Sequence, residues 1–499
     1  MKKREPTAFE QYKSALLEAQ EKMISDFFTK VGEHNALRSK RERRRICADF
    51  ENALLYYSSA GVNIEDAVKR LAPENLGGFY ARPPAAWYAL DDAAKVYPLS
   101  MKHGTMAVFR LSVHLKKKVI PELLQMALTF TIKRFPSFAT ALKKGVFWHY
   151  LDASKRRYAV EEERDVPCRP LKISRSGSPS FRVLYYENRI SVEYFHVLTD
   201  GAGGTVFLKT LVAEYLRLLG EGEFKGDGIL DINEAPRISE TSNDFSMADK
   251  TKNTSGFIDR PSLQLGGRLS DIKPCRILHF KMDAKRLVMV AREKNTTVTG
   301  YILALMFVAG KFATDEMKGN MNIQVPVNMR KEYPSDTLRN FSMYCGIKLD
   351  LEDIADADSI VGEISRQLSE KTSRQNMSEM MNGAKKLVAS VRYVPLFIKA
   401  PVARIIYGFL GDKVFGNTLS NLGVVEFPEG LSKHIDSMDF VLATALTHRA
   451  SCAMVTFGDT ATLSISKMTA DPSFEEKLFE LLYNDGLAPD VEGSELYGY

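Results

Sequence analysis

The stretch YFHVLTDGAGG occupies residues 194–204 and links two different hydrophobic patterns. Before it, the side chains from Ile190 to His196 alternate, which predicts a strand with His196 at its end. After it, the apolar side chains of residues 205–219 repeat at the spacing of one helix face. The glycines in between permit positive φ angles and a close approach of neighbouring backbone. We therefore predict a strand, a tight turn and a helix. The imidazole of His196 would be held by the rigid strand and would face the loop that follows it.

The turn carries two ionisable side chains. His196 suits proton transfer, because an unperturbed imidazole has a pKa of about 6.5, near working pH. Asp200 lies four residues further on and cannot share the strand face, so we expect it to fold back and hold the loop by pairing with an arginine. A histidine beside an aspartate helix cap is also a common structural arrangement, so this pair does not establish catalysis without the rest of the chain.

The remaining sequence predicts a mixed α/β protein with two lobes of similar size. Residues 1–82 form a charged, helical N-terminal extension, and residues 83–220 form the lobe that carries the motif. Residues 221–274 are poor in large apolar side chains, which predicts a crossover linker. Residues 275–499 form the second lobe, in which we expect Thr299 to cap an apolar helix.

Composition and charge argue against several classes of protein. A net charge of +6 on 499 residues is too small to indicate nucleic-acid binding. The five cysteines are scattered, and the N-terminus does not resemble a secretory signal, so we expect a cytoplasmic protein without disulfides or structural zinc. The histidines lack metal-binding spacing, and the sequence has neither a phosphate loop nor a dinucleotide fingerprint.

The residues HVLTDG, at 196–201, resemble the HxxxDG active-site motif of coenzyme A-dependent acyltransferases and of condensation domains in nonribosomal peptide synthetases. Other stretches are similar in kind and order: WYALDDAAKVYPL at 87–99, the opening strand and helix within 106–151, QVPVNMR at 324–330, RNFS at 339–342 and NTLSNLG at 417–423. The bacterial alcohol-acetyltransferase branch is the most similar. The resemblance spans roughly residues 85–499 and implies a two-lobed, chloramphenicol-acetyltransferase-like α/β fold behind the helical extension.

The resemblance also implies an activity and a set of site residues. His196 would deprotonate the hydroxyl or amine of a small-molecule acceptor, which then attacks an acyl-CoA; the acyl-CoA is a co-substrate, and no permanently bound cofactor or metal is expected. Asp200 and Gly201 complete the motif, and we expect Arg330 to be the structural partner of Asp200. Channel or oxyanion candidates are Asn340, Ser342, Ser420 and Asn421, for which turn or cap roles are the alternative.

Other interpretations stay open at this point. The acyl donor could instead be bound to an acyl carrier protein, as in condensation domains, or the fold could serve as a non-catalytic binding scaffold. The basic run at 38–45 is either a solvated helix face or a docking arm for an acidic partner. Residues 394–411 are apolar but contain Lys399, Pro401 and Arg404, so we expect no membrane span and favour a buried helix along the acyl channel over a lipid-surface helix. The acyl chain length, the acceptor and the oligomeric state are not determined by the sequence.

Overall fold

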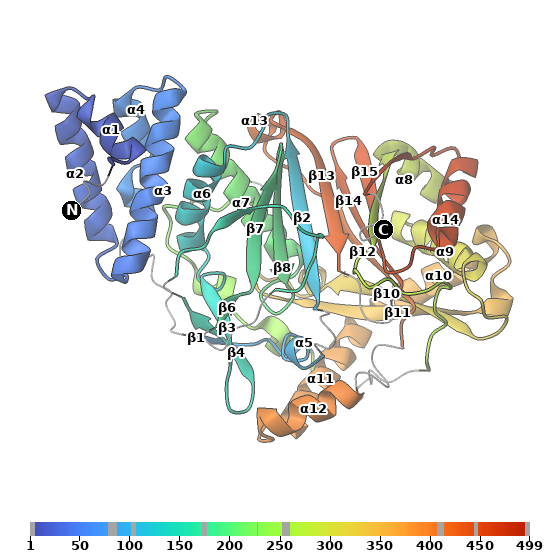
Figure 1. The fold of residues 1–499 in the computed structure, drawn as a ribbon. Helices are drawn as coiled ribbons and strands as arrows, with labels where there is room; N and C mark the ends of the chain where they lie inside the picture. Colours follow the sequence, from blue (N-terminus) through green and yellow to red (C-terminus); the bar gives the residue numbers. More distant parts are fainter. Residues whose placement is uncertain are drawn as a thin grey trace.

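The computed structural model describes residues 5–77, 87–100, 106–154, 156–171, 177–226, 228–251, 260–406, 414–443 and 448–494. Two lobes, each built on a β-sheet with helices packed against it, lie side by side, and a bundle of helices flanks the first lobe (Figure 1). The expected boundary between the extension and the first lobe, at 82/83, lies outside the described residues. The mixed α/β architecture expected from the sequence is confirmed.

The first lobe contains a five-stranded sheet with the strand order β13-β2-β8-β7-β5. Its strands are β2 (Val108–Leu115), β5 (Val160–Glu162), β7 (Phe181–Tyr186), β8 (Arg189–Phe195) and β13 (Ile435–Leu442), and its long helices are α6 (Pro121–Thr131) and α7 (Gly201–Leu219). β7 and β8 pair antiparallel as a hairpin, and β8 is the strand expected before His196. The alternating residues Ile190, Val192 and Tyr194 of β8 have no exposed surface, so the predicted apolar face of this strand lies in the core.

The second lobe contains a seven-stranded sheet with the order β11-β10-β12-β14-β15-β9-β16. Its strands are β9 (Arg276–Asp283), β10 (Asn320–Asn328), β11 (Ser342–Asp350), β12 (Asn417–Val424), β14 (Ala450–Phe457), β15 (Thr460–Lys467) and β16 (Asp490–Gly493). The helices α8 (Ala284–Glu293), α9 (Val298–Phe312), α10 (Ala357–Lys371) and α14 (Ser473–Asn484) accompany it. β10 and β12 pair in parallel, which brings two of the motif-bearing stretches, 324–330 and 417–423, to adjacent strands.

The strand β13 departs from the expected division of the chain. All of 275–499 is expected in the second lobe, but residues 435–442 pair antiparallel with β2 of the first lobe. The chain therefore leaves the second sheet after β12, adds an edge strand to the first sheet and returns as β14. This exchange is a long-range pairing, which local periodicity does not report, and it ties the two lobes together.

The segment expected to be a linker packs against both lobes over its described residues 228–251. Arg134 of the first lobe donates two hydrogen bonds to the Glu240 carboxylate, at 2.5 and 2.7 Å, and both side chains are buried. On the other side, the Leu338 amide donates to the Glu240 carbonyl oxygen at 2.9 Å. The crossover is thus anchored to the first lobe by a buried ion pair, while most of the residues at 231–250 are exposed or partly exposed.

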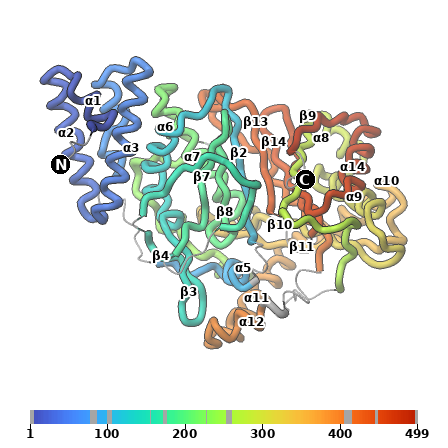
Figure 2. The backbone as a smooth tube through the Cα atoms, in the orientation of Figure 1, coloured from blue at the N-terminus to red at the C-terminus, as the bar shows by residue number. Residues whose placement is uncertain are grey.

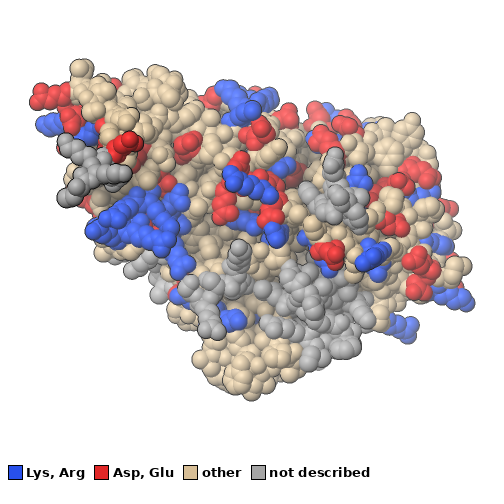
Figure 3. Space-filling view, viewed as in Figure 1, with Lys and Arg blue, Asp and Glu red and all other residues tan. Residues whose placement is uncertain are grey.

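The N-terminal extension is a bundle that packs on the first lobe (Figure 2). It comprises α1 (Ala8–Ser14), α2 (Glu18–His34), α3 (Lys40–Ser59) and α4 (Ile64–Arg70). Phe50 of α3 contacts Phe130 of α6, and the Tyr57 hydroxyl donates to the Leu218 carbonyl oxygen at 2.6 Å. The basic run at 38–45 lies at the start of α3, and Lys and Arg side chains gather on this part of the surface (Figure 3). The extension shares an apolar core with the first lobe.

A smaller layer lies beneath the two lobes. It consists of a four-stranded sheet, β1 (Trp87–Ala89), β4 (His149–Ala153), β3 (Thr140–Lys144) and β6 (Ser178–Pro179), with α5 (Tyr97–Ser100), α11 (Arg374–Ser390) and α12 (Leu396–Ile406) nearby (Figure 1). Within the described residues, no helix is both long enough and apolar enough to cross a membrane.

The start of α9 differs from the expectation. Thr297, not Thr299, is the N-cap, and its hydroxyl accepts a hydrogen bond from the Gly300 amide at 3.1 Å. Thr299 lies inside the first turn, and its hydroxyl accepts from Asn421 Nδ2 at 3.1 Å. The prediction of Thr299 as the cap is wrong because Thr297 reaches the amide three residues on, whereas Thr299 faces β12.

Candidate active site

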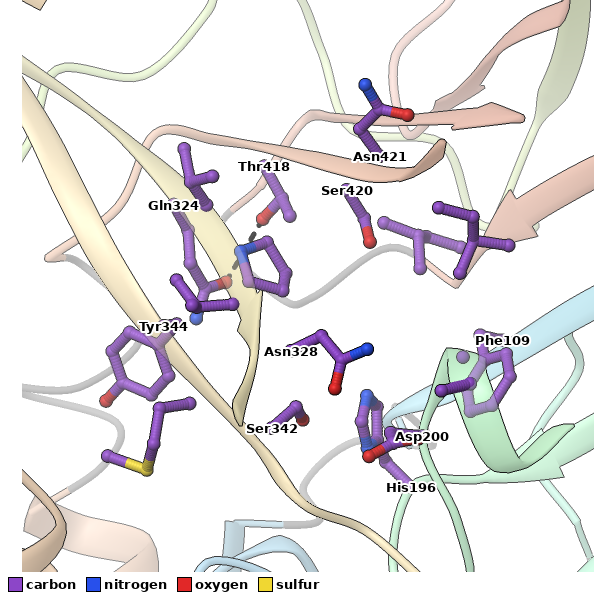
Figure 4. Close-up of a pocket in the computed structure, with 18 of the residues that line it drawn as sticks. Phe109, His196, Asp200, Gln324, Asn328, Ser342, Tyr344, Thr418, Ser420 and Asn421 are labelled. Carbon is purple, nitrogen blue, oxygen red and sulfur yellow. Dashed lines mark hydrogen bonds between the residues drawn. The ribbon is translucent and has the colours of Figure 1, made fainter. Parts of the chain in front are cut away.

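A cavity of about 1070 Å³ lies between the two lobes, and both contribute to its wall. The lining residues used below are Tyr97, Phe109, His196, Asp200, Gly201, Gln324, Asn328, Ser342, Leu387, Thr418, Ser420, Asn421 and His448 (Figure 4). Of the four expected channel or oxyanion residues, Ser342, Ser420 and Asn421 line this cavity and Asn340 does not.

His196 follows β8 directly and is held there by backbone and ring contacts. Its amide donates to the Ala107 carbonyl oxygen at 2.9 Å. Tyr97 stacks on the imidazole with ring centroids 5.1 Å apart, and Phe109 lies at 5.2 Å in a tilted orientation. Nδ1 is buried and has no hydrogen-bond partner among the described residues, so Nε2 is the nitrogen that is open to the cavity. The ring is therefore fixed in place with one nitrogen available to a substrate.

Burial also sets the charge of this imidazole. Loss of solvent lowers the pKa of His196, and the nearby Asp200 carboxylate opposes this only in part. At neutral pH the imidazole is accordingly uncharged and able to accept a proton. The stacked Tyr97 stays protonated under the same conditions, because burial raises its pKa to about 12.

The Asp200 carboxylate accepts three hydrogen bonds, and these join the loop after His196 to the second lobe. Oδ1 accepts from the Gly203 amide at 3.1 Å and so caps α7. Oδ2 accepts from Arg330 Nη1 at 2.7 Å and from the Phe341 amide at 2.7 Å. The carboxylate is 4% exposed, so its charge is balanced almost entirely by protein groups. The role of Asp200 is to position the loop after His196 and to lock the two lobes together.

Close packing, not an unusual backbone, explains the glycines of this loop. Gly201, Gly203 and Gly204 do not have positive φ, so of the two properties that glycine permits, close approach of the backbone is the one used here. A Cβ at Gly203 would overlap the Leu338 carbonyl oxygen and the Thr199 hydroxyl. Thr199 itself donates to that same carbonyl oxygen at 2.6 Å. The first turn of α7 therefore touches the backbone of the second lobe, and only glycine fits.

Arg330 orients Asn328 as well as Asp200. Asn328 Oδ1 accepts from the Arg330 amide at 3.1 Å and from Arg330 Nη1 at 3.2 Å. Because both contacts go to the oxygen, the Nδ2 amino group is not used by Arg330, and Asn328 lines the same cavity as His196 (Figure 4). Asn328 thus presents two N–H groups to the cavity. Sequence patterns did not single out this residue, although it lies inside the quoted stretch 324–330 at the end of a predicted strand.

The four candidate channel residues have different surroundings. The Ser342 hydroxyl donates to Asn340 Oδ1 at 2.8 Å, and Ser342 lies beside the imidazole in Figure 4. Asn340 is 1% exposed and supports Ser342 from behind the wall. Asn421 accepts from the Gly423 amide at 2.8 Å, so its side chain holds the irregular end of β12. Ser420 points toward the middle of the cavity from β12 (Figure 4).

A second histidine lies on the far wall of the cavity. Thr418 Oγ1 is 3.0 Å from His448 Nδ1 and 3.2 Å from Gln324 Oε1. Burial lowers the pKa of His448 to about 4, so this ring is also neutral at pH 7. Tyr97 and Phe109 lie inside the quoted stretches 87–99 and 106–151, but no pattern singled them out as site residues, and His448 lies outside every quoted stretch. Among the described residues, no group of three or more His, Cys, Asp or Glu side chains is arranged to hold a metal ion.

This architecture is the two-lobed condensation and acyltransferase fold, as comparison with solved structures shows. F. graminearum TRI101 in complex with coenzyme A and deoxynivalenol is 10% identical, with a TM-score of 0.56 over 82% of this chain and 100% of that one. TRI3 trichothecene 15-O-acetyltransferase from Fusarium sporotrichioides is 12% identical, with a TM-score of 0.51 over 80% and 94%. The epimerization domain of tyrocidine synthetase B is 12% identical, with a TM-score of 0.50 over 80% and 95%.

At these identities the likeness extends to the fold alone. No protein-family model matches the chain, and no curated protein matches it in sequence. The structures therefore place the chain among two-lobed proteins of this fold, and its chemistry has to be argued from its own residues.

Proposed function

We propose that the protein is an acyltransferase that moves an acyl group from an acyl-CoA thioester to a hydroxyl or amine of a small-molecule acceptor. The observation that carries the proposal is the neutral His196 imidazole, fixed between Tyr97 and Phe109 with one nitrogen open to a cavity between two lobes. The solved structures of the same fold include TRI101 in complex with coenzyme A and deoxynivalenol, which supports this reaction class.

The chemical step needs no covalent enzyme intermediate. The acceptor hydroxyl gives its proton to Nε2 of His196 while its oxygen forms a bond to the thioester carbonyl carbon, and the carbonyl electron pair moves onto oxygen. The tetrahedral intermediate then re-forms the carbonyl and breaks the C–S bond. The imidazolium returns the proton to the departing thiolate, so the products are an ester and free coenzyme A. General-base catalysis of this kind contributes roughly 10²–10⁴ in rate.

The oxyanion of the intermediate requires preorganised donors. Asn328 lines the cavity with His196, and its amino group can donate because Arg330 holds the amide oxygen. The single proton of the Ser342 hydroxyl is donated to Asn340 Oδ1, so Ser342 does not serve as a second donor. We assign Asn328 as the donor, since removal of one such donor costs about 10²–10³ in turnover. Ser420 and Asn421 stay channel-lining residues in this proposal.

Thiol release with a chromogenic disulfide tests the proposal. Purified protein is incubated with acetyl-CoA or longer acyl-CoAs and a panel of alcohols and amines, beside His196→Ala and His448→Asn. We expect acceptor-dependent release of coenzyme A that falls at least about a hundredfold in His196→Ala. His448→Asn, which changes the other neutral histidine of the cavity, should keep turnover within about tenfold of the wild type.

Three outcomes would contradict parts of this proposal. Equal activity in His196→Ala and the wild type would remove the general base. If no acyl-CoA supports transfer but an acyl group on a carrier protein is transferred, the proposed donor is wrong and the reaction class is kept. If neither kind of donor supports transfer, a binding scaffold is favoured.

A further inference from the structure

A convex apolar surface lies at the foot of the small layer. It consists of side chains from the β3–β4 turn, from α11 and from the start of α12, and we call it the apolar tip: Val146, Phe147, Leu387, Tyr393, Phe397, Ile398 and Val402. Their exposed fractions range from 40% for Phe147 to 78% for Phe397. α12 and the hairpin project together from the body in Figure 1, and Figure 3 shows a surface with few charges there. Such a cluster of exposed large apolar residues indicates an interaction surface.

The tip is held in its exposed form by internal contacts. The Leu396 amide donates to the Val146 carbonyl oxygen at 2.8 Å, which joins α12 to the hairpin. Phe147 meets Tyr393 edge to face, with ring centroids 6.3 Å apart. Lys399 lies over the Trp148 ring at 3.3 Å and donates to the Val391 carbonyl oxygen at 3.1 Å. These contacts support the exposed rings from their inner side, so they hold the apolar tip in a defined arrangement.

The charged residues of the segment that carries most of the tip have one sign. From Met380 to Ile406 the sequence has five cationic residues and no Asp or Glu: Lys385, Lys386, Arg392, Lys399 and Arg404. Lys386 and Arg392 are exposed, and Lys144 is exposed at the edge of the hairpin. Apolar side chains flanked by lysine and arginine are the combination that binds the interface of an anionic bilayer.

We propose that the apolar tip is a docking surface for an anionic membrane, on which the protein binds peripherally. Its convex shape and its single sign of charge suit a soft anionic surface better than the groove of a protein partner. The position of the tip also links it to the cavity, because Leu387 belongs to both the tip and the cavity wall, and Ala384 lines the cavity one turn before it. Docking would bring the cavity close to the bilayer. The expectation of a buried helix at 394–411 is wrong for Phe397, Ile398 and Val402, because all three are exposed.

Co-sedimentation of the full chain with lipid vesicles tests the proposal. Sucrose-loaded vesicles of phosphatidylcholine alone and of phosphatidylcholine with phosphatidylglycerol are compared at low and high salt. We expect binding to the anionic vesicles that weakens with salt, since exposed charges are screened. Phe397→Ser should lower the vesicle affinity about tenfold or more, because it removes a large apolar side chain from the bound interface. Arg392→Glu should lower it by a similar factor on anionic vesicles only.

Matched variants away from the tip separate docking from a general loss of fold. Phe312→Ser on α9 changes a phenylalanine that is 63% exposed, and Lys318→Glu changes a lysine whose side chain is 84% exposed. Both should bind vesicles like the wild type, with thermal melts unchanged in all four variants. The proposal is overturned if no vesicle is bound, if Phe397→Ser binds as well as Phe312→Ser, or if the tip variants instead convert a dimer to a monomer. Vesicle binding is measured without any acyl-CoA, so failure here leaves the proposed reaction intact.

Discussion

Arg330 Nη1 lies 2.7 Å from Asp200 Oδ2, although 130 positions separate the two residues in the chain. Arg330 is 14% exposed and also donates to the carbonyl oxygens of Thr337 and Arg339, at 2.7 and 2.8 Å through Nη2. One guanidinium therefore holds the motif loop, the loop before β11 and the Asn328 amide in a single arrangement. The ion pair between the lobes determines the shape of the wall around His196.

Removing the charge of Asp200 should destabilise the protein and slow it. In Asp200→Asn the buried guanidinium of Arg330 loses its counter-charge, which costs about 3 kcal/mol of unfolding free energy. Adding Arg330→Met removes the stranded charge, so the double variant should lose less stability than the sum of the two single changes. Chemical denaturation of the four proteins measures this coupling. Strict additivity would mean that the two residues do not act as a pair.

Gly203→Ala should disturb the contact between the lobes. The new methyl group overlaps the Leu338 carbonyl oxygen and the Thr199 hydroxyl, and we expect a loss of about 1–3 kcal/mol of unfolding free energy with reduced turnover. Gly362→Ala in α10 is the control, because a Cβ there meets no atom within 4 Å and alanine favours the helix by about 0.5–1 kcal/mol. Equal melting temperatures for the two variants would show that Gly203 is not packed as described.

The pH dependence of kcat/KM should report the environment of His196. Because burial lowers the pKa of this imidazole, the base stays neutral to below pH 6.5 and activity is lost only as the pH falls through the lowered pKa. We therefore expect the acidic limb of the profile to have its midpoint below 6.5. Asp200→Asn removes a charge that raises the pKa, so it should move the midpoint further down. An acidic limb centred above 6.5 would contradict the neutral, buried base.

Asn328 should matter to turnover more than the other polar residues of the cavity. Asn328→Asp keeps an oxygen for Arg330 but has no N–H to donate, and we expect kcat to fall by about 10²–10³. Ser420→Ala, which changes another lining residue, should alter KM more than kcat. Steady-state kinetics of both variants with a saturating acyl-CoA separates the two effects. Comparable kcat values would remove Asn328 from the role of oxyanion donor.

Local patterns predicted part of the first lobe. The strand that ends beside His196 and the helix over 205–219 follow from side-chain alternation and helical spacing, which act within about ten residues. The helix begins earlier, at Gly201, so the glycines that we expected in the preceding turn form its first turn. His196 and Asp200 were selected by the resemblance of residues 196–201 to the HxxxDG motif, since the local pattern alone is also typical of a helix cap. Thr299 shows the limit of such reasoning, because two threonines two residues apart offer equal caps and only the observed backbone selects Thr297.

The sequence by itself therefore determined the local elements and the motif, because periodicity and capping depend on near neighbours. Tertiary structure alone decided that β13 joins the first sheet, that Asn328 and His196 line one cavity, and that Tyr97 stacks on the imidazole. Each of these depends on surfaces brought together across more than ninety residues. The tertiary structure also decided that Phe397 and its neighbours face outward. The apolar pattern of 394–411 is the same for a buried and an exposed helix, so only the packing of the other elements determines which face is covered.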